Sequence, residues 1–120
     1  MADKKIINPS EMETQAFPWG RITWLHSGEV SGAEGLTFGE VIINSGRQNG
    51  AHVHPNCEEI LYLISGELVH TYGEEEPYRL TPGMSIRIPA GIKHNAKCTS
   101  SEDARMVVAY SSAYRQVENE

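Results

Sequence analysis

The feature that most constrains the fold of this chain is the short spacing of its glycines, which interrupt the sequence 11 times in 120 residues. The segments between them are rich in β-branched and aromatic residues, which favour β-strands. Short strands at regular spacing, separated by turn residues, are typical of a sandwich or a barrel. We therefore predict an all-β fold with strands at residues 21–27, 36–44, 59–66, 67–72, 78–81, 84–89 and 104–111.

The two ends of the chain are expected to differ from this pattern. The N-terminal segment is predicted to be short and irregular, with a helical turn within residues 8–16, because Ser10 and Glu13 have the spacing of a capping box. The polar terminal stretch 114–120 is expected to fray. No repeat, low-complexity tract or linker divides the sequence, so we predict one domain over residues 1–120.

Charge and composition argue against several classes of function. Ten basic and 16 acidic residues give a net charge of −6, without the clustered Lys and Arg that nucleic acids and anionic membranes attract. No apolar run reaches the roughly 18–20 residues of a membrane span, and the N-terminus lacks the apolar core of a signal peptide. We expect a cytoplasmic protein that binds no nucleic acid and no membrane, and whose partners are small molecules or a second copy of itself.

The chain has two cysteines, Cys57 and Cys98, which are too few for a disulfide framework and are not spaced as a CxxC pair. We expect both to be free thiols. Either thiol would become a candidate ligand if it lay close to a metal ion, because thiolates are strong donors.

Histidine and glutamate side chains gather in the middle of the sequence. His52 and His54 project from the same side of an extended chain, with about 7 Å between their Cα atoms. Two adjacent glutamates follow at the start of the next strand, and alternation allows only one of Glu58 and Glu59 to face the same way. His94, after a Pro-x-Gly turn, is the candidate for a fourth donor.

Three imidazoles and one carboxylate form a donor set that suits Fe, Mn, Co, Ni, Cu or Zn and does not suit Ca or Mg. The competing interpretation is a polar turn with solvated histidines, because one His-x-His pair alone is a weak signal. His26 and His70 are expected to be ordinary surface or packed histidines of this kind. Alternation in residues 84–88 places Met84, Ile86 and Ile88 on a buried face and Arg87 on the less buried side, rather than in a pocket.

Long-range spacing favours the metal-site interpretation. From Gly46 to Gly66 the sequence reads G-x5-H-x-H-x4-E-x6-G, and from Gly83 to His94 it reads G-x5-P-x-G-x2-H. These motifs, at residues 46–66 and 83–98, resemble the two motifs of the cupin family. The second motif departs from the family pattern where Cys98 replaces the last Asn and Met84 replaces the more usual Asp.

The resemblance implies a double-stranded β-helix, or jelly-roll barrel, that holds one divalent transition metal ion. The ligands that it implies are His52, His54, Glu59 and His94. It selects Glu59 over Glu58, and the change to Cys98 lies outside the four ligands. It also implies a homodimer that pairs through the outer β-surface and exchanges terminal strands.

Two enzymatic mechanisms and one binding function fit such a site. A redox-active ion would support dioxygenase chemistry on a substrate with neighbouring oxygens, whereas an ion of fixed valence would act as a Lewis acid in an isomerase or lyase. The alternative is a non-catalytic protein that binds or senses a sugar-like small molecule. No catalytic residue is identified; the candidates for proton transfer are Tyr62, Tyr72, Glu58 and His26.

The substrate is expected to be a small oxygenated metabolite on an apolar floor. The residues expected to form this floor are Leu61, Leu63 and either Ile86 or Ile88. Residues 67–83 are only long enough for a tight hairpin with an exposed tip, so the cover of the pocket is expected from the N-terminal third. For the aromatic cluster Phe17, Trp19 and Trp24, packing or a dimer contact is favoured over a place in the cavity wall.

Overall fold

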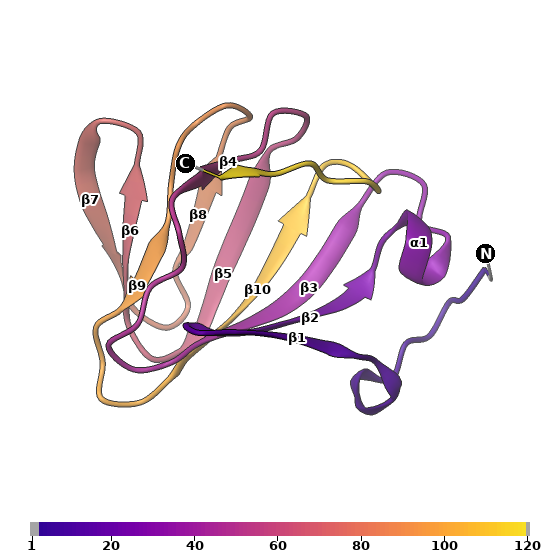
Figure 1. The fold of residues 1–120 in the computed structure, drawn as a ribbon, viewed down its shortest axis with the longest axis horizontal. Coiled ribbons are helices and arrows are strands. Elements are labelled where there is room, and N and C mark those ends of the chain that lie inside the picture. Colours follow the sequence, from indigo (N-terminus) through magenta and orange to yellow (C-terminus); the bar gives the residue numbers. More distant parts are fainter. Residues whose placement is uncertain (1–2, 120) are drawn as a thin grey trace.

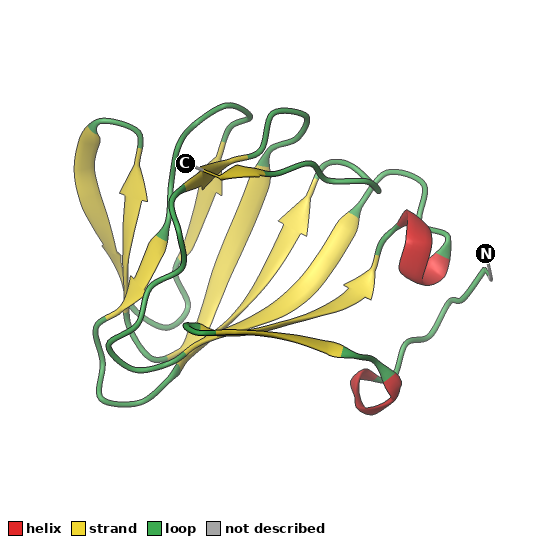
Figure 2. Cartoon of the chain, viewed as in Figure 1, coloured by secondary structure: helices red, strands yellow, loops and turns green. Residues whose placement is uncertain are grey.

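The computed structural model describes residues 3–119, and β-strands are the main secondary structure of this part of the chain (Figures 1 and 2). The strands are β1 (Thr14–Phe17), β2 (Gly20–His26), β3 (Thr37–Ile43), β4 (His52–Val53), β5 (Glu59–Ser65), β6 (Leu68–Tyr72), β7 (Glu75–Leu80), β8 (Ser85–Ile88), β9 (Ala96–Cys98), β10 (Ala104–Tyr110) and β11 (Glu118–Asn119). The two helical segments are the 3-10 helix η1 (Pro9–Glu11) and the one-turn helix α1 (Gly28–Ser31).

The strands form one large and two small antiparallel sheets. The large sheet has the order β1-β2-β3-β10-β5-β8, and the smaller ones are β7-β6-β9 and β11-β4. Figure 1 shows the sheet of β6, β7 and β9 set against the end of the large sheet that carries β5 and β8. Two isolated β-bridges, Gln48–Lys97 and His52–His94, connect β4 and the residues before it with β9 and the residues before that strand. The predicted all-β jelly-roll fold is confirmed.

Strict alternation in the central strands explains where the core lies. In β5, Glu59, Leu61 and Leu63 are buried while the residues between them are exposed, as the sequence predicts. Strand β10 alternates in the same way and places Met106 opposite Leu63 and Val108 opposite Leu61. Each large apolar side chain buried in this way contributes about 1.5–3 kcal/mol to folding.

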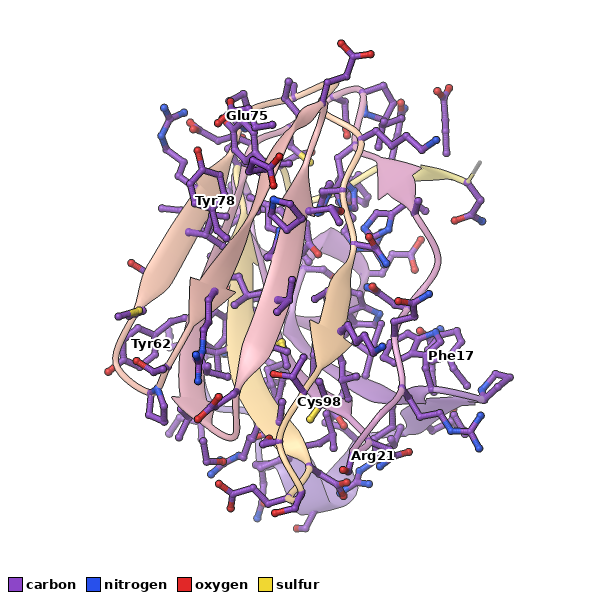
Figure 3. All side chains as sticks on the ribbon, turned by 90° about the vertical axis from the view of Figure 1, so that its left-hand side faces the viewer. Phe17, Arg21, Tyr62, Glu75, Tyr78 and Cys98 are labelled. Atoms are coloured by element: carbon purple, nitrogen blue, oxygen red, sulfur yellow. The ribbon has the colours of Figure 1, made fainter. Side chains whose placement is uncertain are left out.

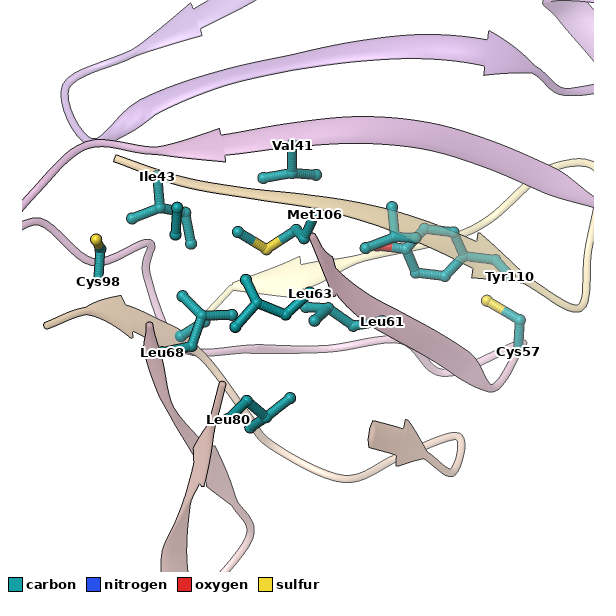
Figure 4. Close-up of a cluster of buried hydrophobic side chains, with 13 residues drawn as sticks. Val41, Ile43, Cys57, Leu61, Leu63, Leu68, Leu80, Cys98, Met106 and Tyr110 are labelled. Carbon is teal, nitrogen blue, oxygen red and sulfur yellow. The ribbon is translucent and has the colours of Figure 1, made fainter. Parts of the chain in front are cut away.

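The inward faces of these strands meet residues from the smaller sheets in one core (Figure 4). Its buried members are Val41, Ile43, Cys57, Leu61, Leu63, Leu68, Leu80, Ala96, Cys98, Ala104, Met106, Val108 and Tyr110. Both cysteines are free and buried, as expected, and Figure 4 shows them at opposite ends of this cluster. Several of these core residues, among them Leu61, Val108 and Tyr110, also line the cavity that holds the polar side chains of the barrel.

The predicted helical turn within residues 8–16 is present, but it is confined to the first part of that segment. Only η1 is helical, and the Asn8 side chain caps it by accepting the backbone N–H of Ser10 at 3.0 Å. The capping-box prediction from Ser10 and Glu13 fails because the chain is already extended at Met12. Residues Thr14–Phe17 then pair with β2 as an edge strand. The sequence did not predict this strand, because all four residues are exposed and show no alternation of buried and exposed positions.

The prediction that residues 114–120 fray was also wrong for the described part of that stretch. Strand β11 pairs with β4, so that Asn119 lies opposite His52 and Glu118 opposite Val53. We call residues 113–119 the C-terminal strap. The side chain of Asn56 anchors it by donating to the Tyr114 carbonyl at 3.0 Å and by accepting the Gln116 N–H at 2.8 Å.

Several smaller expectations were tested by the structure. The link between β6 and β7 is a tight turn whose glutamates are exposed, as predicted. Arg87 lies on the exposed side of β8, where its Nη1 lies 3.2 Å from Glu58 Oε1, so the expected surface position is confirmed. Met84 was assigned wrongly to the buried face, because it precedes β8 in the turn after Thr81 and is 50% exposed. Within residues 3–119, no helix is long and apolar enough to cross a membrane.

Candidate metal centre

The four side chains that sequence analysis selected converge at the open end of the barrel. His52 and His54 come from β4 and the residue after it, Glu59 opens β5, and His94 precedes β9. His52 and His94 are locked side by side by two backbone hydrogen bonds, of 3.0 and 2.9 Å. One ligand atom from each of the four residues lies within 4.8 Å of all the others, so the cluster fits a single metal ion.

The cluster is almost closed to solvent. His54 and Glu59 are each 4% exposed and His94 is 2% exposed, while His52 is partly buried at the edge. Glu59 Oε1 lies 3.4 Å from His54 Nε2 and 3.6 Å from His94 Nε2. The carboxylate therefore faces two imidazole nitrogens within the barrel and does not reach water.

Backbone carbonyls fix the tautomers of two histidines. His52 Nδ1 lies 2.7 Å from the carbonyl of Gly50, and His54 Nδ1 lies 2.9 Å from the carbonyl of Gln116. Because a carbonyl oxygen only accepts, both Nδ1 atoms must carry the proton and donate it. Both Nε2 atoms are then left with a lone pair, which is the arrangement that orients metal-binding histidines.

Unpaired buried atoms supply the test of whether a metal fits. Within residues 3–119, the buried polar side-chain atoms without a hydrogen-bond partner are His54 Nε2, Glu59 Oε1 and both ring nitrogens of His94. Leaving such a group unpaired costs about 1–3 kcal/mol. All of these atoms belong to one cluster, and a cation is the one group that would satisfy several lone pairs at once. The donor set of three nitrogens and one oxygen suits a divalent transition metal.

Burial sets the protonation states that a metal ligand needs. It lowers the pKa of His52 and lowers that of His94 to about 3, so both rings are neutral at neutral pH. Burial alone would raise the pKa of Glu59, but the neighbouring imidazoles of His54 and His94 outweigh it, and the pKa is lowered. Glu59 is therefore the charged ligand, and His52 and His94 are neutral ones.

A cavity of about 370 Å³ opens beside the cluster. Its walls are mainly apolar, and its polar lining outside the cluster comes from Asn49, His70, Tyr110, Arg115 and Asn119. The C-terminal strap supplies two of these polar residues and also Val117. The expectation that only the N-terminal third covers the pocket was therefore wrong, because the pairing of β11 with β4 brings the opposite terminus over it.

Two of the three N-terminal aromatics lie in the cavity wall. Phe17 and Trp19 line it and stack on each other with ring centroids 4.8 Å apart. The sequence had favoured packing or a dimer contact for these residues over a place in the cavity wall. Trp24 instead packs beside Tyr110 at 6.0 Å. Of the expected floor residues only Leu61 lines the cavity, because Leu63 lies deeper in the core and β8 faces another groove.

None of the four candidates for proton transfer lines this cavity. Tyr62 is 45% exposed on the outer face of β5, as Figure 3 illustrates, and Glu58 pairs with a surface arginine. Tyr72 borders a separate groove near Glu75 and Tyr78, and His26 Nδ1 lies 2.8 Å from the Ser31 hydroxyl. Both cysteines also lie outside the four-residue cluster and the cavity lining.

Sequence reasoning missed many of the residues that line the cavity, including His70, Tyr110 and Arg115. His70 is packed, as expected, with 1% exposure, but its ring is stacked on that of His94 at 5.3 Å. Alternation placed His70 with Leu68 on the inner face of β6, and Tyr110 with Val108 on that of β10, so this signal was available. Arg115 gave no such signal because it lies outside any strand.

Comparison with known proteins agrees with this geometry. Residues 39–110 match the family model described as the cupin domain. A Streptomyces cyaneus protein named polyketide synthase CurC is 30% identical over 104 residues, which are 86% of this chain and 66% of that protein. Protein SchB of Streptomyces halstedii is 26% identical over 88 residues, 73% of this chain and 63% of that protein. The chain thus spans about two thirds of the length of these relatives.

Among solved structures, oxalate decarboxylase of Lactobacillus farciminis in a formate complex superposes with a TM-score of 0.85. The two chains are 16% identical, and the match covers 92% of this chain and 34% of the decarboxylase chain. At this identity the likeness concerns the fold.

Proposed function

The chain belongs to the cupin family, and from this premise we propose that it is a metal-dependent enzyme acting on a small oxygenated metabolite. One observation carries the proposal: donor atoms of four side chains face one another beside an open cavity, and the buried ones of His54, Glu59 and His94 have no other partner. An uncompensated group of this kind is costly to bury, so a barrel that had lost its metal would have little reason to keep it.

His52, His54, Glu59 and His94 are the residues that would hold the ion. A divalent transition ion with four protein ligands and two open positions supplies Lewis-acid polarisation of a bound oxygen or, if it is redox-active, chemistry with dioxygen. The second role corresponds to a dioxygenase and the first to an isomerase or lyase. The protein contributes a fixed donor set, oriented by the carbonyls of Gly50 and Gln116.

The cavity supports a compact substrate. Its volume of about 370 Å³ falls in the range of small-molecule sites, and its apolar walls exclude water from the ligand. The name of the Streptomyces cyaneus relative refers to a polyketide synthase, and polyketide carbon chains carry regularly spaced oxygens. We infer that the substrate binds with its oxygenated end towards the four-residue cluster and its carbon skeleton against Phe17, Trp19 and Leu61.

Tyr110 is the residue best placed to hold a proton beside the substrate. Its ring lies 4.9 Å from that of His54, and burial followed by the nearby Glu59 charge raises its pKa well above the usual value. The hydroxyl therefore stays protonated and acts as a hydrogen-bond donor at neutral pH. In this role it would orient a substrate oxygen and would not serve as a base.

We also propose that the protein is a homodimer that pairs through the outer face of its large sheet. Strand β5 exposes Ile60, Tyr62 and Ile64 on that face, and β3, on the other side of β10, exposes Phe38. Light scattering after size exclusion tests this proposal: wild type should have the mass of two chains and Tyr62→Lys a lower mass. A monomeric wild type would contradict it.

Metal analysis of protein purified without a metal-affinity tag tests the proposed function. Wild type should contain about one transition metal ion per chain, His52→Ala and His94→Ala should lose it, and both variants should remain folded. His70→Ala is the matched control, because His70 is equally buried in the same cavity but lies outside the cluster. Full occupancy in both ligand variants would refute the assignment.

Turnover assays with oxo acids and diketones then distinguish the mechanisms. Chelator-sensitive turnover with oxygen uptake supports the dioxygenase, and chelator-sensitive turnover without it supports Lewis-acid chemistry. Tight binding of a small molecule without any product would favour the alternative of a sensor.

A further inference from the structure

The C-terminal strap holds one arginine at the cavity beside the candidate metal centre. Arg115 Cζ lies 4.4 Å from the centroid of the Trp24 ring and 5.3 Å from that of Tyr110. The other neighbour of the Tyr110 ring is His54, at 4.9 Å. One tyrosine ring therefore separates the guanidinium from the candidate metal cluster.

The contacts of Arg115 differ from those of the arginines that form ion pairs at the surface. Arg79, Arg87 and Arg105 each form an ion pair with a glutamate, at 2.8, 3.2 and 2.7 Å. Within residues 3–119, Arg115 has no ion pair and its guanidinium has no hydrogen-bond acceptor. Contact with aromatic rings occupies the face of a guanidinium and leaves the N–H groups at its edge free to donate.

The charges around the cavity favour an anion. Arg115 and Glu59 are its only lining residues, among those described, that carry a fixed charge at neutral pH. With a divalent ion bound, Glu59 would offset only part of the positive charge.

We propose that Arg115 is the residue that recognises an anionic group, a carboxylate, on the substrate. A guanidinium binds a carboxylate through two parallel hydrogen bonds, which a neutral group of the same size cannot form. The substrate class is thus a carboxylic acid that carries metal-binding oxygens at one end and a carboxylate at the other. This inference rests on the proposed function, since it concerns the substrate of the same site.

A purely structural role for Arg115 makes a different prediction. If the side chain only clamps the strap onto Trp24, its replacement would disturb ligands with and without a distal carboxylate equally. If it binds the carboxylate, replacement would affect only ligands that carry one. The difference in affinity between two matched ligands separates these roles.

The probes are 2-oxo acids that share one metal-binding end and differ at the other. 2-Oxoglutarate is paired with 2-oxovalerate, and 2-oxoadipate with 2-oxohexanoate, so each pair tests one distance between the ends. Binding to the metal-loaded protein is measured by calorimetry for wild type, Arg115→Gln and Arg115→Lys. Arg79→Gln, which breaks a surface ion pair, is the matched control.

In wild type and in Arg79→Gln, at least one diacid should bind about 10-fold more tightly than its matched monoacid. Arg115→Gln should reduce this preference to less than about 2-fold with an unchanged monoacid affinity and metal content, and Arg115→Lys should restore part of it. Equal binding of diacid and monoacid by wild type, or a preference that survives in Arg115→Gln, would overturn the inference alone. A wild type that holds no metal would overturn the proposed function and this inference with it.

Discussion

Replacing Glu59 with glutamine is expected to stabilise the metal-free protein and to abolish its response to metal. The carboxylate is 4% exposed, and its Oε1 lies 3.4 and 3.6 Å from the Nε2 atoms of His54 and His94. The His54 ring donates its Nδ1 proton to the Gln116 carbonyl, so its Nε2 presents a lone pair to the Glu59 carboxylate, and Glu59 Oε1 has no hydrogen-bond partner. A glutamine has the same shape, carries no charge and brings two N–H donors to this position.

The size of the effect follows from these contacts. A new hydrogen bond to the Nε2 lone pair of His54 contributes about 0.5–1.5 kcal/mol to the free energy of unfolding. We therefore expect Glu59→Gln to gain about 0.5–1.5 kcal/mol without metal. For a chain of this length the midpoint of thermal unfolding should rise by about 2–6 °C.

Metal should reverse the order of the two proteins. An ion at 100 times its dissociation constant stabilises the protein that binds it by about 2.7 kcal/mol. Wild type would gain this amount, whereas Glu59→Gln has lost its only anionic ligand and would gain little. The variant is thus the more stable protein in chelator and the less stable one in saturating metal.

Chemical unfolding at pH 8, with chelator and then with added Zn²⁺ or Mn²⁺, measures both effects. Glu58→Gln is the control, because this neighbouring glutamate lies on the opposite face of the strand and pairs only with Arg87 at the surface. It should change stability by less than about 1 kcal/mol and keep the full response to metal. The reasoning is refuted if metal-free Glu59→Gln is less stable than wild type or if it retains the wild-type response.

Three further perturbations probe the strap, the core and the buried imidazoles. Deleting the C-terminal strap removes the carbonyl that accepts from His54 and should weaken metal binding about 10–100-fold in a chelator competition, with an unchanged circular dichroism spectrum. Leu63→Ala should cost about 2–5 kcal/mol in urea unfolding, whereas Leu36→Ala, 60% exposed, should cost less than about 1. As the pH falls below 6.5, His94 should lower the free energy of unfolding of the metal-free protein by about 1.4 kcal/mol per pH unit. The reason is that the pKa of His94 is about 3 in the folded protein, so only the unfolded chain binds the proton in this range. A stability that does not change with pH would contradict this.

The sequence predicts the donor cluster well because local rules determine most of it. Alternation puts His52 and His54 on one side and separates Glu59 from Glu58, and the structure keeps both assignments. His94 required the long-range motif spacing, since its backbone pairing with His52 joins segments about 40 residues apart. The inner faces of the long strands were predictable for the same reason: one buried face leaves a period of two.

The surroundings of the cluster were harder to predict because they depend on contacts that leave no local pattern. The pairing of Glu118 and Asn119 with β4 involves two polar residues at the end of the chain, so the sequence indicated fraying. The role of Phe17 depends on the edge hairpin that carries it to the cavity. The candidates for proton transfer were chosen for their chemistry, and only the three-dimensional arrangement shows that Tyr62 lies on the outer face.

The C-terminal strap contributes both to the candidate metal centre and to the charge of the cavity. Its Gln116 carbonyl fixes the tautomer of His54, and the residue before it, Arg115, supplies the cavity with its positive charge. Both positions depend on the same anchor, since Asn56 holds the strap on either side of Arg115. A few substitutions in this short segment would therefore change which anions the cavity accepts while β4, β5 and the approach to β9 keep the donor cluster in place. On the proposed function, residues in and next to β4, β5 and β9 hold the metal, and the C-terminal strap that crosses them selects the substrate.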